Sequence, residues 1–295
     1  MFASVPRIAL FVLLALLLGS CSRVDLAYRN LDRLALWWVD DYLELSGEQK
    51  NWMRARLQDD LAWHCTTQLP RYVEWLDEQR RLAERPSLLP EEFEARFDDI
   101  DADLLAIAEH ITPSAVELLR QLSDRQIAGM ARRFDENLRE LHKKYLAPSP
   151  ERQIAQRGKR MEQRLRPWLG RLSPQQRARI QVWATAMNAR TQLWLDNRRH
   201  WQQSLLTVLA SRADDGFPQR IARLLQEPES IWTEEYRRSF LDSRSDLASL
   251  LADLFNGASE AQRNRLATRL AELRDDLQGL SCAEPAQDQE VTTAR

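Results

Sequence analysis

Apolar residues recur at intervals of three and four along nearly the whole chain, from Leu26 to about residue 280. This spacing gathers them on one face of a helix, whereas a half-buried strand would alternate apolar and polar positions. We find no convincing alternating run. We therefore predict an all-α fold in which long antiparallel helices form an elongated bundle. The first stretch shows the pattern at Leu31, Leu34, Trp38, Tyr42 and Leu45.

Four Ser-x-x-Gln sequences indicate where helices begin. In such a capping box the serine oxygen accepts from the backbone N–H of the third helical residue, and the glutamine reaches back to the backbone of the serine. Proline directly after a capping residue is a second sign of a helix start, since its missing N–H costs nothing there. The boxes are Ser46 with Gln49, Ser123 with Gln126, Ser173 with Gln176, and Ser259 with Gln262. The prolines follow in Thr112-Pro113, Ser149-Pro150 and Ser173-Pro174.

The longest predicted helix runs from Pro174 to about Ser211, and a candidate partner runs from Gly47 to about Ala83. Pro70 should bend the partner, because proline cannot donate to the helical ladder. One face of the longest helix carries a heptad-like apolar stripe, a pattern typical of shallow helix crossings. The stripe consists of Ile180, Trp183, Met187, Trp194, Trp201, Leu205 and Val208.

The first twenty residues have the pattern of an export signal. Arg7 precedes an apolar run from Ile8 to Leu18, which is too short to cross a bilayer but has the length of a signal-peptide core. Leu18-Gly19-Ser20-Cys21 then resembles the lipobox of bacterial lipoproteins. The resemblance implies cleavage after residue 20 and acylation of Cys21. The alternatives are an ordinary secretory signal with a chance cysteine, or a residual anchor helix.

These signals divide the chain into four parts. Residues 1–20 are the predicted lipoprotein signal peptide, 21–26 a short lipid-anchored tether, 27–281 the all-helical domain, and 282–295 a polar tail that we expect to be disordered. The predicted lipid would hold the protein on a membrane, facing the periplasm. Ser22 after the cysteine, in place of Asp, favours the outer over the inner membrane.

A longer segment resembles the start of a family of Gram-negative, largely helical lipoproteins with no assigned function. It comprises Tyr28-Arg29-Asn30-Leu31, Leu36-Trp37-Trp38-Val39-Asp40-Asp41-Tyr42 and Leu45-Ser46. The resemblance extends over most of the mature chain and implies a cell-envelope address and a helical fold, without a substrate or catalytic residues. A weaker resemblance links the Leu-Ser-x-x-Gln stretches to small periplasmic stress chaperones whose helices begin with Leu-Thr-x-x-Gln. In this chain Ser replaces Thr, and the fourth copy has Ala258.

Cys65 and Cys282 remain once Cys21 is lipidated. In an oxidising compartment an even pair is read as a disulfide, and two unrelated thiols are the alternative. The bridge would tie the C-terminal end of the fold to the second helix.

Charge is segregated along a chain of formal net charge −2, which argues against a nucleic-acid binder. Residues 84–110 carry nine acidic and two basic side chains, and residues 151–179 carry nine basic and two acidic ones. The basic segment could meet an anionic partner such as phospholipid head groups, lipopolysaccharide or cell-wall polymer. Alternatively, the two segments neutralise each other in the fold or simply face water.

The tryptophan stripe is the main candidate binding surface. Three tryptophans and two arginines near the seam could hold an apolar chain or an exposed polypeptide, with cation–π support. Plain core packing between long helices would produce the same pattern. The candidate residues are Trp183, Arg190, Trp194, Arg198 and Trp201.

The sequence offers little for catalysis or metal binding. The carboxylates of Asp99, Asp101 and Asp103 alternate as in a calcium loop, but the required Gly and Glu are replaced by Leu104 and His110. His64 beside Cys65 has no short-spaced partner for zinc. Adjacent Asp40 and Asp41 would point about 100° apart on a helix. We therefore expect no metal, no cofactor and no catalytic residues.

Three functions are compatible with this pattern. We favour a non-catalytic interaction module of the envelope, either a scaffold or a chaperone-like holder, that binds an envelope protein or an anionic envelope polymer. A second possibility is an enzyme acting on cell wall or lipid, which facing carboxylates of raised pKa in a cleft would support. A third is a carrier of lipid or another apolar ligand, for which an internal Trp-lined cavity would be the sign.

Overall fold

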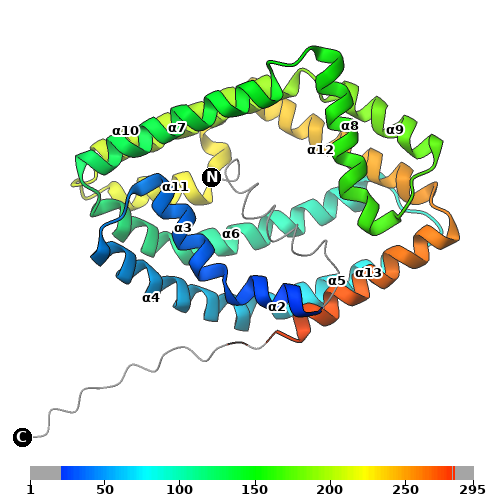
Figure 1. Cartoon of the computed structure of the whole chain (residues 1–295), viewed down its shortest axis with the longest axis horizontal. Coiled ribbons are helices and arrows are strands. Elements are labelled where there is room, and N and C mark those ends of the chain that lie inside the picture. Colours follow the sequence, from blue (N-terminus) through cyan, green and yellow to red (C-terminus); the bar gives the residue numbers. More distant parts are fainter. Residues whose placement is uncertain (1–20, 281, 283–295) are drawn as a thin grey trace, which may run out of the picture.

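Every regular element in the described part of the chain is a helix, which confirms the predicted all-α fold. The computed structural model describes residues 21–280 and residue 282. The helices form an elongated frame, crossed near its middle by α6 (Figure 1). In chain order they are α2 (Cys21–Arg29), α3 (Leu31–Leu43), α4 (Gly47–Trp63), η1 (His64–Gln68), α5 (Leu69–Ala83), α6 (Pro90–Arg120), α7 (Asp124–Tyr145), α8 (Pro150–Leu169), α9 (Pro174–Ala186), α10 (Arg190–Ala210), α11 (Phe217–Gln226), η2 (Pro228–Ile231), α12 (Glu234–Asn256) and α13 (Glu260–Gln278).

All four predicted capping boxes are present in the structure, with both hydrogen bonds of each box formed. They begin α4, α7, α9 and α13. The boxes also meet in pairs, which the sequence did not predict. We call the meeting of the α3–α4 and α6–α7 turns the first junction, and the meeting of the α8–α9 and α12–α13 turns the second junction. In each junction one capping glutamine donates its amide N–H to the other.

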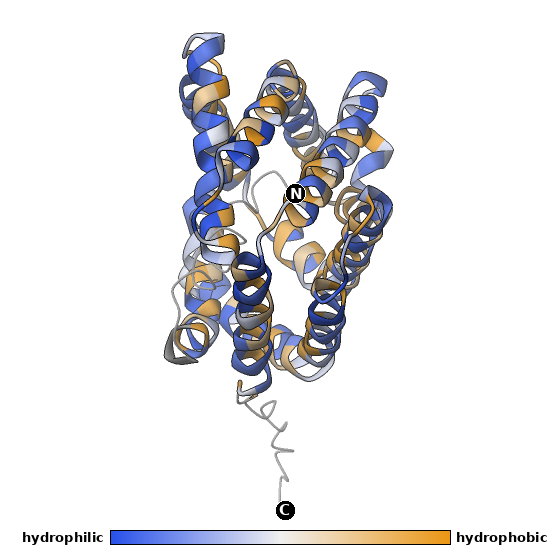
Figure 2. Cartoon of the chain, turned by 90° about the vertical axis from the view of Figure 1, so that its right-hand side faces the viewer, coloured by the Kyte–Doolittle hydropathy of each residue, from blue (hydrophilic) through white to orange (hydrophobic). Residues whose placement is uncertain are grey.

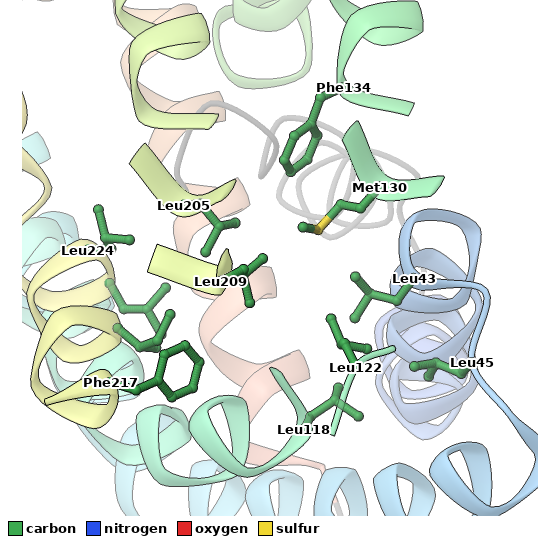
Figure 3. Close-up of a cluster of buried hydrophobic side chains, with 12 residues drawn as sticks. Leu43, Leu45, Leu118, Leu122, Met130, Phe134, Leu205, Leu209, Phe217 and Leu224 are labelled. Carbon is green, nitrogen blue, oxygen red and sulfur yellow. The ribbon is translucent and has the colours of Figure 1, made fainter. Parts of the chain in front are cut away.

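The first junction lies beside the larger hydrophobic core (Figure 3). The leucine before each capping serine, Leu45 or Leu122, is buried there, and Phe217 and Ile221 from α11 are fully enclosed. Figure 3 shows Leu43 from α3, Leu122 from the α6–α7 turn and Met130 from α7 pointing toward one another. Burial of each such side chain contributes roughly 1.5–3 kcal/mol, so this cluster fixes the relative positions of α3, α4, α6, α7, α10 and α11.

The second junction has its own, smaller core. Leu172, which precedes the capping serine of α9, packs there with Ile180, Leu250 and Leu254. A third cluster joins α5 to α13 through Leu76, Phe255 and Leu270. Helices α5 and α13 run side by side along one long edge of the frame, and α7 and α10 run along the other (Figure 1). Around most helices hydrophilic and hydrophobic residues occupy different sides, as Figure 2 shows.

The predicted single helix from Pro174 to Ser211 is wrong, because the chain turns between Ala186 and Arg190. Backbone bonds tighten to three-residue spacing at this turn, from Asn188 N to Thr185 O and from Arg190 N to Met187 O. The half-buried guanidinium of Arg157 donates to Ala184 O at 2.8 Å and to Thr191 Oγ1 at 2.8 Å. It thus satisfies a carbonyl that the break releases from the helical ladder. The same turn divides the predicted apolar stripe into one part on α9 and another on α10.

Two further boundaries differ from the predictions. The 47–83 helix is interrupted before Pro70 by the wider turn η1, in which Leu69 N donates to His64 O. This five-residue step carries the chain past the missing N–H of proline. The predicted helix start at Thr112-Pro113 is wrong, since Pro113 lies inside α6. Thr112 Oγ donates to Ala108 O at 2.6 Å, and other helices pack around this turn.

Two predicted segments lie outside the described residues: the leader 1–20 and the tail after Cys282. Residues 21–26, predicted as a tether, form the first part of α2. Among the described helices, none combines the length and the apolar character needed to cross a membrane.

Candidate functional site

A cavity of about 930 Å³ lies between the two junctions. Its wall is built by α6 from the first junction, by α12 from the second, and by α10, α11 and η2, which connect them. Helices α6 and α12 are clamped together by Arg244, whose guanidinium bonds Asp98 at 2.5 Å and also pairs with Asp101. The volume lies in the range of sites that hold drug-sized ligands.

Aromatic side chains dominate one part of this wall. Trp232 lies 4.6 Å from Phe240 and 5.1 Å from Tyr236, measured between ring centroids. Burial raises the pKa of the Tyr236 hydroxyl, which therefore stays protonated. On the opposite side, Trp201 is fixed by a 3.1 Å hydrogen bond from Nε1 to Leu224 O. Trp194 packs edge-on against Tyr145, at a centroid distance of 6.1 Å. These rings offer a rigid apolar surface at low conformational cost.

Most polar groups of the cavity wall already form ion pairs or hydrogen bonds within the protein. Arg190 pairs with Asp246 at 2.8 Å and donates to Ser243 Oγ at 3.2 Å. Arg237 donates to Glu229 O at 2.6 Å and lies over the Trp232 ring. In contrast, Asn197 Oδ1 is buried at the wall with no hydrogen-bond partner in the described structure. A buried acceptor without a partner is costly, so a ligand N–H at this position would be favoured.

Four of the five residues proposed from the stripe line this cavity, namely Arg190, Trp194, Arg198 and Trp201. The fifth does not. Trp183 packs with Ile180 in the core of the second junction, because the turn at 187–189 separates α9 from α10. One half of the stripe is therefore core, and the other half is cavity wall. Arg198 is itself 4% exposed and donates to Asn137 Oδ1.

The second aromatic group was not predicted from the sequence. Trp232, Tyr236 and Phe240 follow one another at intervals of four, so the spacing that places them on one face was visible. Nothing in the sequence said that this face meets α10. The exposed leucines Leu105 and Leu241, which line the cavity at its opening, were missed for the same reason.

The carboxylates whose pKa is raised lie elsewhere. Burial raises the pKa of Asp60, which is 3.2 Å from His110, while Trp63 stacks on the His110 ring. Burial also raises the pKa of Asp103, which pairs with Arg71 at 3.0 Å. Neither carboxylate lines the cavity.

Two other acidic features of the sequence are explained by packing. Asp40 caps the α3–α4 turn by accepting from Leu45 N, and Asp41 pairs with Arg133 at 3.0 Å, so the two point to different partners. Asp99, Asp101 and Asp103 lie within the continuous helix α6. The described residues contain no cluster of His, Cys, Asp and Glu able to hold a metal ion.

The acidic and basic segments do not neutralise each other. The acidic segment pairs with Arg71 and Arg244 as well as with its own arginines, and α8 packs against α9 and α13 rather than α6. On α8 the side chains of Arg152, Lys159 and Arg166 are exposed.

Cys65 and Cys282 are joined in a disulfide, with a Cα–Cα distance of 5.6 Å. Next to the bridge, His64 Nδ1 lies 3.1 Å from the Tyr28 hydroxyl, and Tyr72 contacts the imidazole edge-on. Burial lowers the pKa of His64 to about 4 and raises that of Tyr28 to about 12, so both are neutral at pH 7. The disulfide and the side chains around it thus hold α2, η1 and the end of α13 together.

Comparison with known proteins places the chain in a family without giving it an activity. No curated protein and no solved structure matches the chain significantly. The pattern of one family, described as a family of unknown function (DUF6279), matches residues 41–237. That range begins in α3, ends in α12, and includes the α6, α10, α11 and η2 parts of the cavity wall. The chain therefore belongs to the family of unknown function DUF6279.

Proposed function

We propose that this protein is a lipid-anchored, periplasm-facing module of the bacterial envelope, which binds apolar segments of polypeptides without catalysing a reaction. The cavity between the two junctions is the binding site, and its aromatic wall is the observation on which the proposal rests. The anchor rests on the lipobox-like sequence at Cys21 and the export pattern before it. Ser22 supports an outer-membrane location.

The chemistry of the wall favours a polypeptide over a lipid. A fatty acid or phospholipid needs a cation for its head group, but Arg190 and Arg237 already have acceptors within the protein. A polypeptide brings apolar side chains for the rings, and a backbone N–H that could donate to Asn197 Oδ1. The exposed leucines at the opening, Leu105 and Leu241, extend the apolar surface outward.

Fluorescence anisotropy with a labelled apolar peptide tests this proposal. The Trp194→Ala and Leu241→Asp variants should each weaken binding, by roughly 30-fold for the tryptophan if it anchors the ligand. Leu241 is 57% exposed, so its substitution should leave folding intact. Val182→Ala is the matched control, because Val182 is 64% exposed on α9 and does not line the cavity.

Three outcomes would contradict the proposal. Unchanged peptide affinity in both cavity variants would show that the cavity is not the binding site. Displacement of the peptide by hexadecanoate at lower concentration than by unlabelled peptide would favour the lipid-carrier alternative. Recovery of the Cys21→Ala variant in the membrane fraction would remove the argument for the lipid anchor.

A further inference from the structure

The outward side of α2 and α3 has an unusual composition for a solvated helix surface. Leu26 is 63% exposed and Trp37 66% exposed, with Leu34 between them. The other exposed residues described on these two helices are Arg29, Arg33 and Asp41, of which Asp41 pairs with Arg133 at 3.0 Å. Leu26, Leu34 and Trp37 recur at helical spacing with the two arginines, and the Leu34 N to Asn30 O bond continues the ladder across the short interruption between the helices. We call this surface the α2–α3 outer face.

The inward side of the same helices is apolar too. Val24 and Tyr28 pack beside the disulfide, and Leu36, Val39 and Tyr42 pack on the core of the first junction. Leu26, Leu34 and Trp37 therefore take no part in the hydrophobic cores. A surface helix normally keeps its large apolar residues on one face, so apolar residues on the second face indicate a second apolar contact.

Basic side chains surround Trp37. A shallow cavity of about 330 Å³ is lined by Trp37 and Leu36, by three basic side chains and by one acidic one, namely Arg33, Lys50, Arg54 and Asp40. Lys50 pairs with Asp40 at 2.8 Å, and Arg54 donates to Asn51 Oδ1. In the part of the chain that the structure describes, no acidic group pairs with Arg33 or Arg54. Two guanidiniums are thus available to an anionic group beside an exposed tryptophan.

This combination matches the chemistry of a bilayer surface. Tryptophan partitions to the level of lipid head groups, leucines reach into the acyl boundary, and arginines bury their stems while the charged end meets phosphate. From these observations we infer that the α2–α3 outer face lies on a phospholipid bilayer, with Leu26, Leu34 and Trp37 in the interfacial layer and Arg33 and Arg54 on lipid phosphates.

The position of the face along the chain identifies which bilayer it meets. Leu26 follows Cys21 by five residues in the same helix, and the face extends to Trp37, roughly 16 Å further along. This step rests on the proposed acylation of Cys21. A lipid at that position would hold α2 at the leaflet, so docking of the outer face would orient the cavity relative to the membrane rather than leave the domain to rotate on its anchor.

Depth-dependent fluorescence on the acylated chain tests the contact. An environment-sensitive label is attached through a Trp37→Cys substitution, and in a matched sample through Val182→Cys, in vesicles of phosphatidylethanolamine and phosphatidylglycerol. Both native positions are similarly exposed, and α9 lies at the opposite end of the long axis from α3 (Figure 1). The label at 37 should shift to the blue and be quenched by nitroxide lipids, and the label at 182 should not.

The outcomes separate the two proposals. A vesicle-bound chain whose label at 37 stays in water contradicts the bilayer contact alone. An acylated chain that remains in solution contradicts both the anchor and the contact.

Charge removal gives a second test that needs no acyl group. In the Cys21→Ala chain, replacing both Arg33 and Arg54 by alanine should lower partitioning onto the same vesicles by roughly fivefold for each charge, about 25-fold together. Arg152→Ala with Lys159→Ala on α8 is the control, and it should have little effect. A larger loss from the α8 pair would overturn the inference and assign the bilayer contact to the basic helix.

Discussion

The two junctions are built from the same four-residue signal but are held differently. At the first junction Gln126 Nε2 donates to Gln49 Oε1 at 2.8 Å and to the nearby carbonyls of Leu43 and Glu44, and Gln126 is half-buried. At the second junction Gln176 and Gln262 exchange hydrogen bonds in both directions, at 3.1 and 3.0 Å, and both are buried. The first junction relies more on its large apolar core, and the second more on its buried polar pair.

The difference shows how one local signal can serve two kinds of packing. A capping box fixes where a helix begins, and the glutamine retains hydrogen-bonding capacity for whatever lies beside it. The cavity lies between the junctions, where α6 and α12 run from one to the other. Its shape therefore depends on both junctions keeping their positions.

The disulfide couples the two halves, and its removal should have the largest effect. Cys65 follows α4 from the first junction, and Cys282 follows α13 from the second. Opening this loop of 217 residues is expected to lower the free energy of unfolding by roughly 5 kcal/mol in the chain-entropy model. Urea denaturation of the Cys65→Ala, Cys282→Ser chain measures the loss. Equal urea midpoints with and without the bridge would show that the halves do not depend on it.

The leucine before the capping serine should matter at the first junction. Leu122 is 2% exposed, and Leu122→Ala should cost about 3 kcal/mol through lost burial and the cavity left behind. The fourth copy of the motif has Ala258 at the equivalent position, so the second junction already lacks one such leucine. Val182→Ala serves as the exposed control in the same denaturation series. A loss below about 1 kcal/mol would contradict the view that the first junction depends on its apolar core.

Acid should destabilise the protein through His64, which lies beside the disulfide. The folded-state pKa of His64 is lowered to about 4 by burial, against about 6.5 in an unfolded chain. Between these values the unfolded chain binds a proton that the folded chain does not, so stability falls as the pH drops from about 6.5 to about 4, by at most about 3 kcal/mol. Unfolding measured at pH 7 and pH 5 should show a smaller change in His64→Gln than in the parent. Exposed His200→Gln should retain the parent's pH dependence.

The smallest effects should distinguish the two glutamine pairs directly. Gln176→Ala leaves buried Gln262 without its partner and should cost about 2 kcal/mol. Gln126→Ala removes the half-buried member of the first pair and should cost about 1 kcal/mol. The comparison requires both variants in one denaturation experiment. If Gln126→Ala proves the more damaging of the two, the order assigned to the junctions is reversed.

Local signals in the sequence predicted much of the fold. Helical periodicity gave the all-α class, and the four Ser-x-x-Gln boxes gave the first turns of α4, α7, α9 and α13, because a capping box satisfies its own backbone groups within four residues. The spacing also identified Trp194 and Trp201 as facing one way. These features depend on neighbours along the chain, so the chain alone determines them.

The tertiary structure decided what those faces meet. The same stripe ends in a core at Trp183 and in an open cavity at Trp194, because a turn supported by Arg157 from α8 directs α9 and α10 to different partners. Trp232, Tyr236 and Phe240 complete the cavity wall only because α12 passes α10. Periodicity records which side chains share a helix face. Whether that face is filled by another helix or left open depends on contacts between residues far apart in the sequence.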